Sequence, residues 1–367
     1  SVTGVQTCAL PIYGADPTGV SNSTDAFNLA IAQINANSGG ALIIPTGTYT
    51  VGKDALVVGS GWVATQLTEF FECDNPGVVE GNGAVIKYAD GLHFGVFNTT
   101  TGAPVVTTTP YFGVGAADPG QCFKFSGCAN VTIRNLEIDG NITNFVIGGQ
   151  WGDTGWQLGH VGFSFYGCKQ AVADNIYVHN FGVDGFIIEG RYYDGASWIQ
   201  LDLETEQYPH EIRNIKSNYN GRQGCSWTGG NRVIMTNCEF AHTGKNGVVQ
   251  SSPSAGIDIE PNSPEFCANG TFVNCYFYDN YGVGILTVGD VSNCTFVNCT
   301  SIGTTNSSLW NPGTYMKYLG CYCNGKIFYP GPISGSMEKT HSKFYGCRIA
   351  MVSADSPTTS IFGNYCE

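Results

Sequence analysis

The segment AGIDIEP, residues 255–261, alternates isoleucines with carboxylates. Successive side chains of a β-strand point to opposite faces, so Ile257 and Ile259 are expected on one face and Asp258 and Glu260 on the other. A strand with one apolar and one acidic face belongs at the surface of a β-structure. Its acids are either ordinary solvated side chains or part of an active site.

Three other segments share the outline of a glycine followed by a strand-like run: DGFIIEG (184–190), RQGCSWTGG (222–230) and YGVGILTVG (281–289). The glycines that align are Gly185, Gly224, Gly256 and Gly284. This alignment stacks the four segments on successive coils, with layers about 4.8 Å apart and apolar side chains filling the interior.

A second set of repeats has a polar turn residue, an apolar residue, a variable residue and another apolar residue. Its members are NLEI (135–138), NIYV (175–178), NIKS (214–217), NCEF (237–240), NCYF (274–277), NCTF (293–296) and GCRI (346–349). The shortest separations between the starts of successive repeats are about 20 residues, which is typical of one coil of a β-solenoid.

The N-terminal third begins with a different pattern. Residues 23–40, STDAFNLAIAQINANSGG, predict a helix with Ser23 or Thr24 at its start and a glycine pair after its end. Apolar residues recur in it at helical spacing, at Phe27, Ile31 and Ile34.

Residues 13–51, YGADPTGVSNSTDAFNLAIAQINANSGGALIIPTGTYTV, resemble the start of the pectate-lyase-like superfamily. The resemblance implies an all-β chain, a right-handed single-stranded parallel β-helix whose open end is capped by the N-terminal helix. Members with this opening include polygalacturonase-like hydrolases, polysaccharide lyases, epimerases and phage tailspikes. The resemblance therefore indicates the fold and leaves the reaction open. It also implies an extracellular or virion-surface protein, and a homotrimer if the chain is tailspike-like or otherwise a monomer.

The first residues, 1–12 (SVTGVQTCALPI), lack the basic start and apolar run of a signal peptide. They resemble the translation of a sequencing adapter, a scar known from metagenomic gene predictions. We therefore expect a single domain over 13–367 and a true N-terminus that is missing.

Composition excludes several partners. The formal charge is −13 and only 12% of residues are charged, so a nucleic-acid partner is not expected. No run of 18 apolar residues is present, so a membrane span is not expected either. Cysteines recur in N-C-x-F contexts, at Cys238, Cys275 and Cys294, and this repetition favours buried core thiols over disulfides. Their spacing does not fit a zinc site, and we expect no metal or cofactor.

Acids gather on the aligned coils. Asp258 and Glu260 should have Cβ atoms roughly 6.5 Å apart, and Glu189 should lie two layers away, roughly 9.5 Å from Glu260. Both separations match the carboxyl spacing of an inverting glycosidase. We take Asp184, Glu189, Asp258 and Glu260 as the candidate catalytic set. The alternative is an ordinary salt-bridge network centred on Arg222.

Three long segments, residues 98–121, 148–161 and 190–211, are expected to form loops beside the coils. Aromatic side chains on such loops either stack on sugar rings or anchor the loop to the coil. The candidate substrate-binding residues are Arg222, Gln223, His210, Trp198, Tyr192, Tyr193, Trp156 and Trp227.

The sequence thus predicts a polysaccharide-degrading enzyme, most simply a glycoside hydrolase. A lyase acting on a uronate-containing glycan is one alternative. In it, Arg222, Lys245 or His242 would be the base, and Asp258 and Glu260 would bind Ca²⁺. The other alternative is a non-catalytic glycan-binding or tailspike domain. The motifs NTD, DD, GHG and RIK of polygalacturonases, in that order, are absent, as is the DPHD motif of alginate epimerases. No catalytic residue is therefore carried over from those families.

Overall fold

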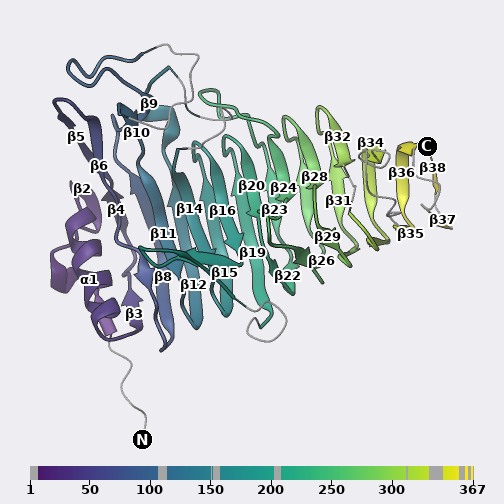
Figure 1. Ribbon diagram of the computed structural model, residues 1–367, viewed down its shortest axis with the longest axis horizontal. Coiled ribbons are helices and arrows are strands. Elements are labelled where there is room, and N and C mark those ends of the chain that lie inside the picture. The colour runs from purple at the N-terminus through teal and green to yellow at the C-terminus, as the bar shows by residue number, and fades with distance from the viewer. Residues whose placement is uncertain are drawn as a thin grey trace, which may run out of the picture.

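The computed structural model describes residues 7–105, 114–149, 151, 158–201, 208–310, 313–329, 342–354, 360–362 and 365–366. Parallel strands stack in rows along one long axis, from the N-terminal end to the C-terminal end (Figure 1). Candidate sites therefore lie on the outer faces of these rows or on the turns between them, because the interior is filled by side chains.

One row of strands, which we name the site sheet, carries the aligned glycines. Its strands are β11 (Gly120–Ser126), β14 (His160–Tyr166), β16 (Asp184–Glu189), β20 (Gln223–Trp227), β24 (Ala255–Ile259), β28 (Val283–Thr287) and β32 (Ser307–Trp310). Phe186 pairs with Cys225, which pairs with Ile257, so the predicted alignment of the glycines is confirmed. A Cβ at Gly224 would lie 2.5 Å from the carbonyl oxygen of Gly256, a separation that real Cβ atoms do not reach. Glycine is thus required for the close stacking of these strands.

A second row contains the asparagine repeats, except that Asn293 of NCTF (293–296) stacks on Asn269 at the preceding turn and is not aligned with Asn274. Its first strands are long: β8 (Gly77–Tyr88), β12 (Asn130–Asp139), β15 (Gln170–His179) and β19 (His210–Asn218). Asn135, Asn175 and Asn214 adopt left-handed φ values of 60°, 56° and 56°, which bend the strand. The Asn175 amide donates to Asn135 Oδ1 at 3.0 Å, so neighbouring bends are linked in a ladder.

Beyond β19 each long strand is replaced by two strands on either side of a left-handed turn residue, which is Asn237, Asn274, Asn298, Gly320 or Gly346 in successive coils. These are β22 (Val233–Thr236) and β23 (Glu239–Ala241), β26 (Thr271–Val273) and β27 (Tyr276–Tyr278), β30 (Thr295–Val297) and β31 (Thr300–Ile302), β33 (Lys317–Leu319) and β34 (Tyr322–Tyr329), and β35 (Lys343–Tyr345) and β36 (Arg348–Ala354). The last strands are β37 (Ser360–Phe362) and β38 (Tyr365–Cys366).

The N-terminal end is closed by helix α1 (Thr24–Ala36), as predicted (Figure 1). Phe27, Ile31 and Ile34 are fully buried on its inner face. Strand β1 (Thr7–Ala9) pairs with β3 (Gly40–Ile43), and Leu10 in the 3₁₀ turn η1 (Leu10–Tyr13) is fully buried. Residues 7–10, which were expected to lie outside the domain, therefore pack against it.

The remaining described elements are short. They are β2 (Thr18–Asn22), β4 (Thr48–Val51), β5 (Lys53–Val57), β6 (Gly61–Thr65), β7 (Phe70–Phe71), β9 (His93–Val96), β10 (Ala116–Ala117), η2 (Ile142–Asn144), β13 (Val146–Ile147), β17 (Arg191–Tyr193), β18 (Trp198–Gln200), β21 (Gly230–Asn231), β25 (Cys267–Ala268) and β29 (Val291–Ser292). In the described part of the chain, no helix is both long and apolar enough to cross a membrane.

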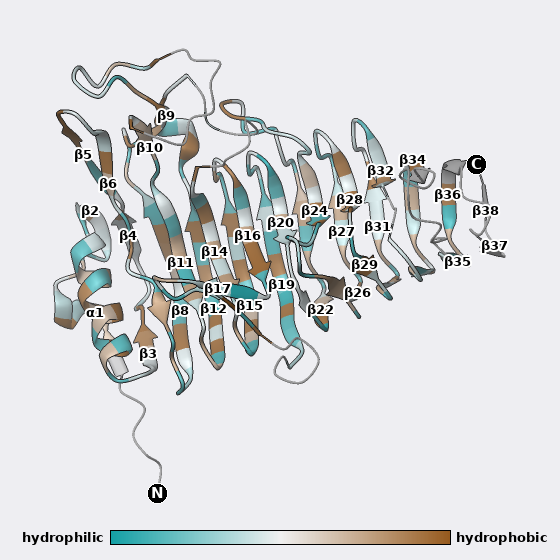
Figure 2. Cartoon of the chain, in the orientation of Figure 1, coloured by the Kyte–Doolittle hydropathy of each residue, from teal (hydrophilic) through white to brown (hydrophobic). Residues whose placement is uncertain are grey.

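The core is a stack of aromatic side chains and thiols. Phe163 and Phe186 stack at 4.8 Å between ring centroids, and Phe272 and Phe296 at 4.3 Å. Thirteen described cysteines are buried free thiols, which confirms that the N-C-x-F cysteines are core residues. Along the strands, apolar residues alternate with polar ones (Figure 2), so polar side chains reach the outer faces.

Candidate functional site

Asp258 lies on the outer face of the site sheet, where its strand β24 is flanked by β20 and β28. Its neighbours Ile257 and Ile259 are fully buried in the core. Asp258 pairs with Ser226 on one side and with Leu286 on the other. Glu260 is exposed, as expected, but Asp258 is only 5% exposed. The expectation that both acids project into water is therefore corrected for Asp258, because neighbouring side chains shield it.

The Asp258 carboxyl has one oxygen paired and one unpaired. Gln223 Nε2 donates to Asp258 Oδ2 at 2.7 Å, and the backbone N–H of Ala255 donates to Gln223 Oε1 at 3.2 Å. The second bond fixes which end of the Gln223 amide faces the acid. Asp258 Oδ1 is buried and has no hydrogen-bond partner.

Burial raises the pKa of Asp258 to about 8, and the negative charge of Glu260 acts in the same direction. The Arg222 cation lowers this pKa, but it does not overcome the first two effects. Asp258 is therefore mainly protonated at neutral pH. Because Oδ2 accepts the Gln223 hydrogen bond, the proton belongs on Oδ1, the oxygen without a partner.

Arg222 is held by Asp184 beside this acid. Arg222 Nε donates to Asp184 Oδ1 at 2.8 Å, a second bond joins Nη2 to Oδ2, and Ser226 Oγ donates to the same Oδ2 at 2.8 Å. Asp184 is fully buried, so its proposed catalytic role is corrected: its carboxylate orients Arg222 and has no route to a substrate.

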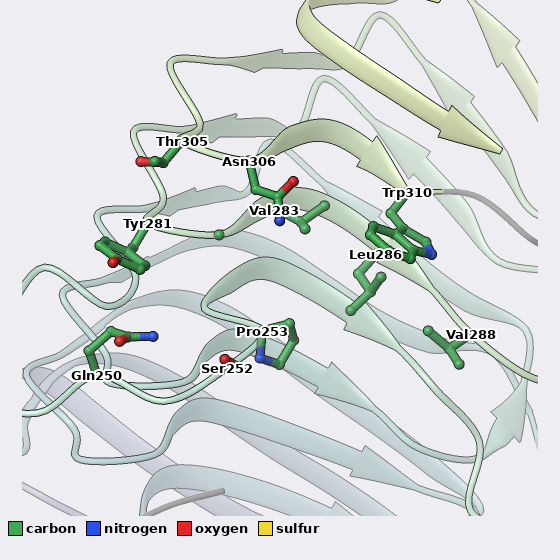
Figure 3. Close-up of a pocket in the computed structure, with 11 residues that line it drawn as sticks. Gln250, Ser252, Pro253, Tyr281, Val283, Leu286, Val288, Thr305, Asn306 and Trp310 are labelled. Atoms are coloured by element: carbon green, nitrogen blue, oxygen red, sulfur yellow. The ribbon is translucent and has the colours of Figure 1, made fainter. Parts of the chain in front are cut away.

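An outer pocket of about 880 Å³ adjoins Asp258 on the C-terminal side. It is lined by Gln250, Ser252, Pro253, Tyr281, Gly282, Val283, Leu286, Val288, Thr305, Asn306 and Trp310. Leu286 is paired directly with Asp258, and Trp310 is paired with Leu286. Figure 3 shows Trp310 and Leu286 side by side, with Tyr281 and Gln250 toward the opposite end. The neutral acid thus lies one strand from the pocket floor.

Glu189 lies in a separate network and not with Asp258. Its carboxylate accepts from Arg191 Nε at 2.9 Å, Thr228 Oγ1 at 2.9 Å and Asn262 Nδ2 at 2.8 Å. It is 5% exposed. Its assignment to the catalytic set is therefore corrected, because its carboxylate is already bonded to the hairpin β17–β18, to the end of β20 and to the turn after β24.

Glu265, which the sequence analysis did not single out, belongs to the same network. Burial raises the pKa of Glu265, and its contact with Glu189 raises it further. Gln200 Nε2 donates to Glu265 Oε1 at 2.8 Å, while Oε2 has no partner. A raised pKa favours the neutral form of Glu265 beside the Glu189 carboxylate, so we assign Glu265 to the scaffold.

Two candidate substrate-binding residues are in the core. Trp227 is fully buried, and its Nε1 donates to the Gly229 carbonyl at 3.1 Å. His210 is also fully buried, accepts from the Ala171 N–H at 3.0 Å, and has its pKa lowered to about 4 by burial. Neither side chain can contact a glycan, so both assignments are corrected.

The loop aromatics lie outside the pocket lining. Tyr192 donates to Glu72 Oε1 at 3.0 Å and packs over a neighbouring turn, so it anchors the hairpin. Tyr193 and Trp198 are about half exposed, and their rings are tilted to one another with centroids 5.7 Å apart. Trp156 lies outside the described residues. Sequence reasoning missed the pocket, although Leu286 occupies the outward position that aligns with Asp258.

Two of the bases considered for a lyase are engaged elsewhere. His242 Nδ1 lies 2.8 Å from Asp279 Oδ2, and Lys245 contacts Asp279 Oδ1. Neither lines the outer pocket. Of these candidates, Arg222 alone acts electrostatically on Asp258, and it is bonded to Asp184.

The stacked parallel coils, the capping helix and the site on an outer face define the class: this chain is a right-handed parallel β-helix protein. Residues 199–365 match the family model described as "Right handed beta helix region". No curated protein sequence matched the chain.

Solved structures share this fold at low identity. The A-module of mannuronan C-5 epimerase AlgE4 from Azotobacter vinelandii is 16% identical, with a TM-score of 0.57 over 98% of this chain and 95% of that one. ORF18 of Geobacillus virus E2 is 16% identical, with a TM-score of 0.59 over 98% of this chain and 60% of that one. The tailspike gp49 from Acinetobacter baumannii bacteriophage Fri1, titled a capsular polysaccharide depolymerase, is 14% identical, with a TM-score of 0.57 over 100% of this chain and 58% of that one. The chain thus spans about three fifths of the two phage proteins.

Proposed function

We propose that this protein is an extracellular or virion-surface enzyme that hydrolyses a polysaccharide bound in the outer pocket. The observation that carries the proposal is the Asp258 carboxyl, which is buried with Oδ1 unpaired one strand from the pocket floor, so that its pKa is raised to about 8. Similar folds that act on polysaccharides, by their titles an epimerase and a capsule depolymerase, support a glycan as the ligand.

In this mechanism Asp258 is the general acid and Glu260 the general base. The Oδ1 proton of Asp258 passes to the glycosidic oxygen as its bond to the anomeric carbon breaks. Glu260 takes a proton from a water molecule whose oxygen bonds to that carbon. The spacing of two residues along one extended segment, roughly 6.5 Å between Cβ atoms, leaves room for this water.

A second candidate function is glycan binding without cleavage. It is favoured by the shielding of Asp258 Oδ1, which is a buried atom. Under the hydrolase proposal, a bound glycan displaces the side chains that cover this oxygen. Under the binding proposal, Asp258 stays covered and only supports the pocket wall.

A panel of neutral and acidic polysaccharides, assayed for reducing ends and for unsaturated ends, separates these functions. We expect one polymer to yield reducing ends without unsaturated ends, because water adds across the bond that breaks. Replacement of Glu260 by Gln should lower this rate by about 10²- to 10⁴-fold through loss of the base.

Products with unsaturated ends would indicate a lyase. A polymer that binds to the protein but yields no product would indicate a binding domain. Light scattering of the same sample distinguishes a monomer from the homotrimer that a tailspike-like chain forms.

A further inference from the structure

The lining of the outer pocket carries no ionisable acid or base among its described residues other than the phenol of Tyr281. The eleven lining residues include no Asp, Glu, Lys, Arg or His. The chain around this pocket has a net charge of −13, and Asp258 is paired with the lining residue Leu286. An anionic sugar placed here would meet negative potential without a cation in the wall to offset it.

The floor of the pocket is apolar. Leu286, Val283 and Ala255 form a small hydrophobic cluster that is separate from the main core, with Val288 and Trp310 packed against it. The strand partners of Leu286 at this position are Asp258 and Trp310, so the apolar patch lies on the outer face of the site sheet. In Figure 3, Leu286, Val288 and Trp310 gather at one end of the pocket.

The rim supplies neutral hydrogen-bonding groups. Gln250, Ser252 and Tyr281 line one side, and Thr305 and Asn306 line the next coil. Amides and hydroxyls of this kind pair with sugar hydroxyls without selecting a charge. The indole face of Trp310 suits the C–H face of a sugar ring.

Arg222, the cation that acts on Asp258, is already paired. Arg222 is bonded to Asp184 through two nitrogen–oxygen contacts, and it is not among the lining residues. A uronate in the pocket would therefore have to compete with a buried carboxylate for this guanidinium.

We infer that the outer pocket selects a neutral glycan whose sugars carry apolar substituents, such as 6-deoxyhexoses or O-acetylated hexoses, and rejects uronate chains. This inference rests on the proposed function, which places the glycan in the outer pocket, and it adds the class of glycan that binds there. The methyl or acetyl groups lie against Leu286 and Trp310, while ring hydroxyls face the amide and hydroxyl rim.

The test measures binding without turnover. The Asp258→Asn variant is run by affinity electrophoresis in gels containing a rhamnan, a dextran or polygalacturonate, each at matched mass concentration and low salt. We expect retention in the order rhamnan, dextran, polygalacturonate, with rhamnan bound about tenfold more tightly than dextran, the effect of one apolar group in a fitted pocket.

Two substitutions are then added to this variant. Leu286→Lys should weaken rhamnan binding by about tenfold and strengthen polygalacturonate binding, because it replaces apolar surface with a cation. Trp310→Ala should weaken all retention through loss of the stacking face. Val63→Lys, on the exposed hairpin β5–β6, makes the same charge change away from the pocket and should leave retention unaltered.

Four outcomes would overturn the inference. Three concern retention: polygalacturonate retained as strongly as rhamnan, no retention of either neutral polymer, and retention that Leu286→Lys and Trp310→Ala leave unchanged. The fourth is association of copies through the pocket, seen by light scattering as an oligomer that Leu286→Lys dissociates. Failure of the hydrolase proposal alone would give another result. The polymers would still be retained in the expected order, but the unsubstituted protein would release product from none of them.

Discussion

Replacement of Asp258 by Asn is expected to lower polysaccharide turnover by about 10²- to 10⁴-fold, the usual contribution of a general acid. The amide has nearly the same size, and its oxygen can still accept from Gln223 Nε2, so the fold should persist. What is lost is the proton on Oδ1. The rate should be measured as reducing ends released from the polymer identified by the panel.

The pH dependence follows from the same carboxyl. Because the pKa of Asp258 is raised to about 8, the acid form prevails below that pH and disappears above it. Activity should therefore fall as pH rises through about 8, and this alkaline fall should be absent from the residual activity of Asp258→Asn. Asp290→Asn, an exposed acid in the turn after β28, is the matched control and should behave as the unsubstituted protein. Full activity in Asp258→Asn would remove this residue from the mechanism.

Replacement of Trp227 by Ala is expected to lower the free energy of unfolding by about 3–5 kcal/mol. The side chain is among the largest in the core, and its loss leaves a cavity beside Phe272, 6.4 Å away between ring centroids. It also removes the donor to the Gly229 carbonyl. Denaturant unfolding followed by circular dichroism measures this change.

The control is the same substitution at Trp198, which is 56% exposed on the hairpin and contacts Arg191. That change should cost about 1 kcal/mol or less. Equal stability losses at the two positions, or a Trp227→Ala protein that is as stable as its parent but has lost glycan binding, would contradict the placement of Trp227 in the core.

Much of the fold was predictable because successive coils of a solenoid require the same residue types at equivalent positions. Gly224 marks a strand that approaches the next one too closely for a Cβ, and the same requirement returns at Gly256. The turn asparagines Asn135 and Asn175 mark left-handed bends in the same way. The packing of Leu10 was not predictable, because residues 1–12 carry no repeat and were set aside.

The site was predictable only in part. The two-residue period placed Asp258 on the outer face, but it could not show that neighbouring side chains would bury the carboxyl and raise its pKa. The same period places Trp227 on the inner face, between the outward-facing Ser226 and Thr228. Trp227 was expected to bind substrate because tryptophan suits sugar rings, although its position in the strand predicts burial. Glu189 was misassigned because its partner Asn262 lies 73 residues away on a turn. The pocket walls around Gln250 and Thr305 are also turns, whose paths no periodicity specifies.

The central claim is that Asp258 holds a proton at neutral pH beside a glycan-binding surface. The most direct test is a titration of aspartate side-chain carbonyls by ¹³C NMR, with the Asp258 signal assigned by its loss in Asp258→Asn. We predict a midpoint near pH 8 for this signal. A midpoint near 4, the value of an ordinary exposed aspartate, would contradict the account.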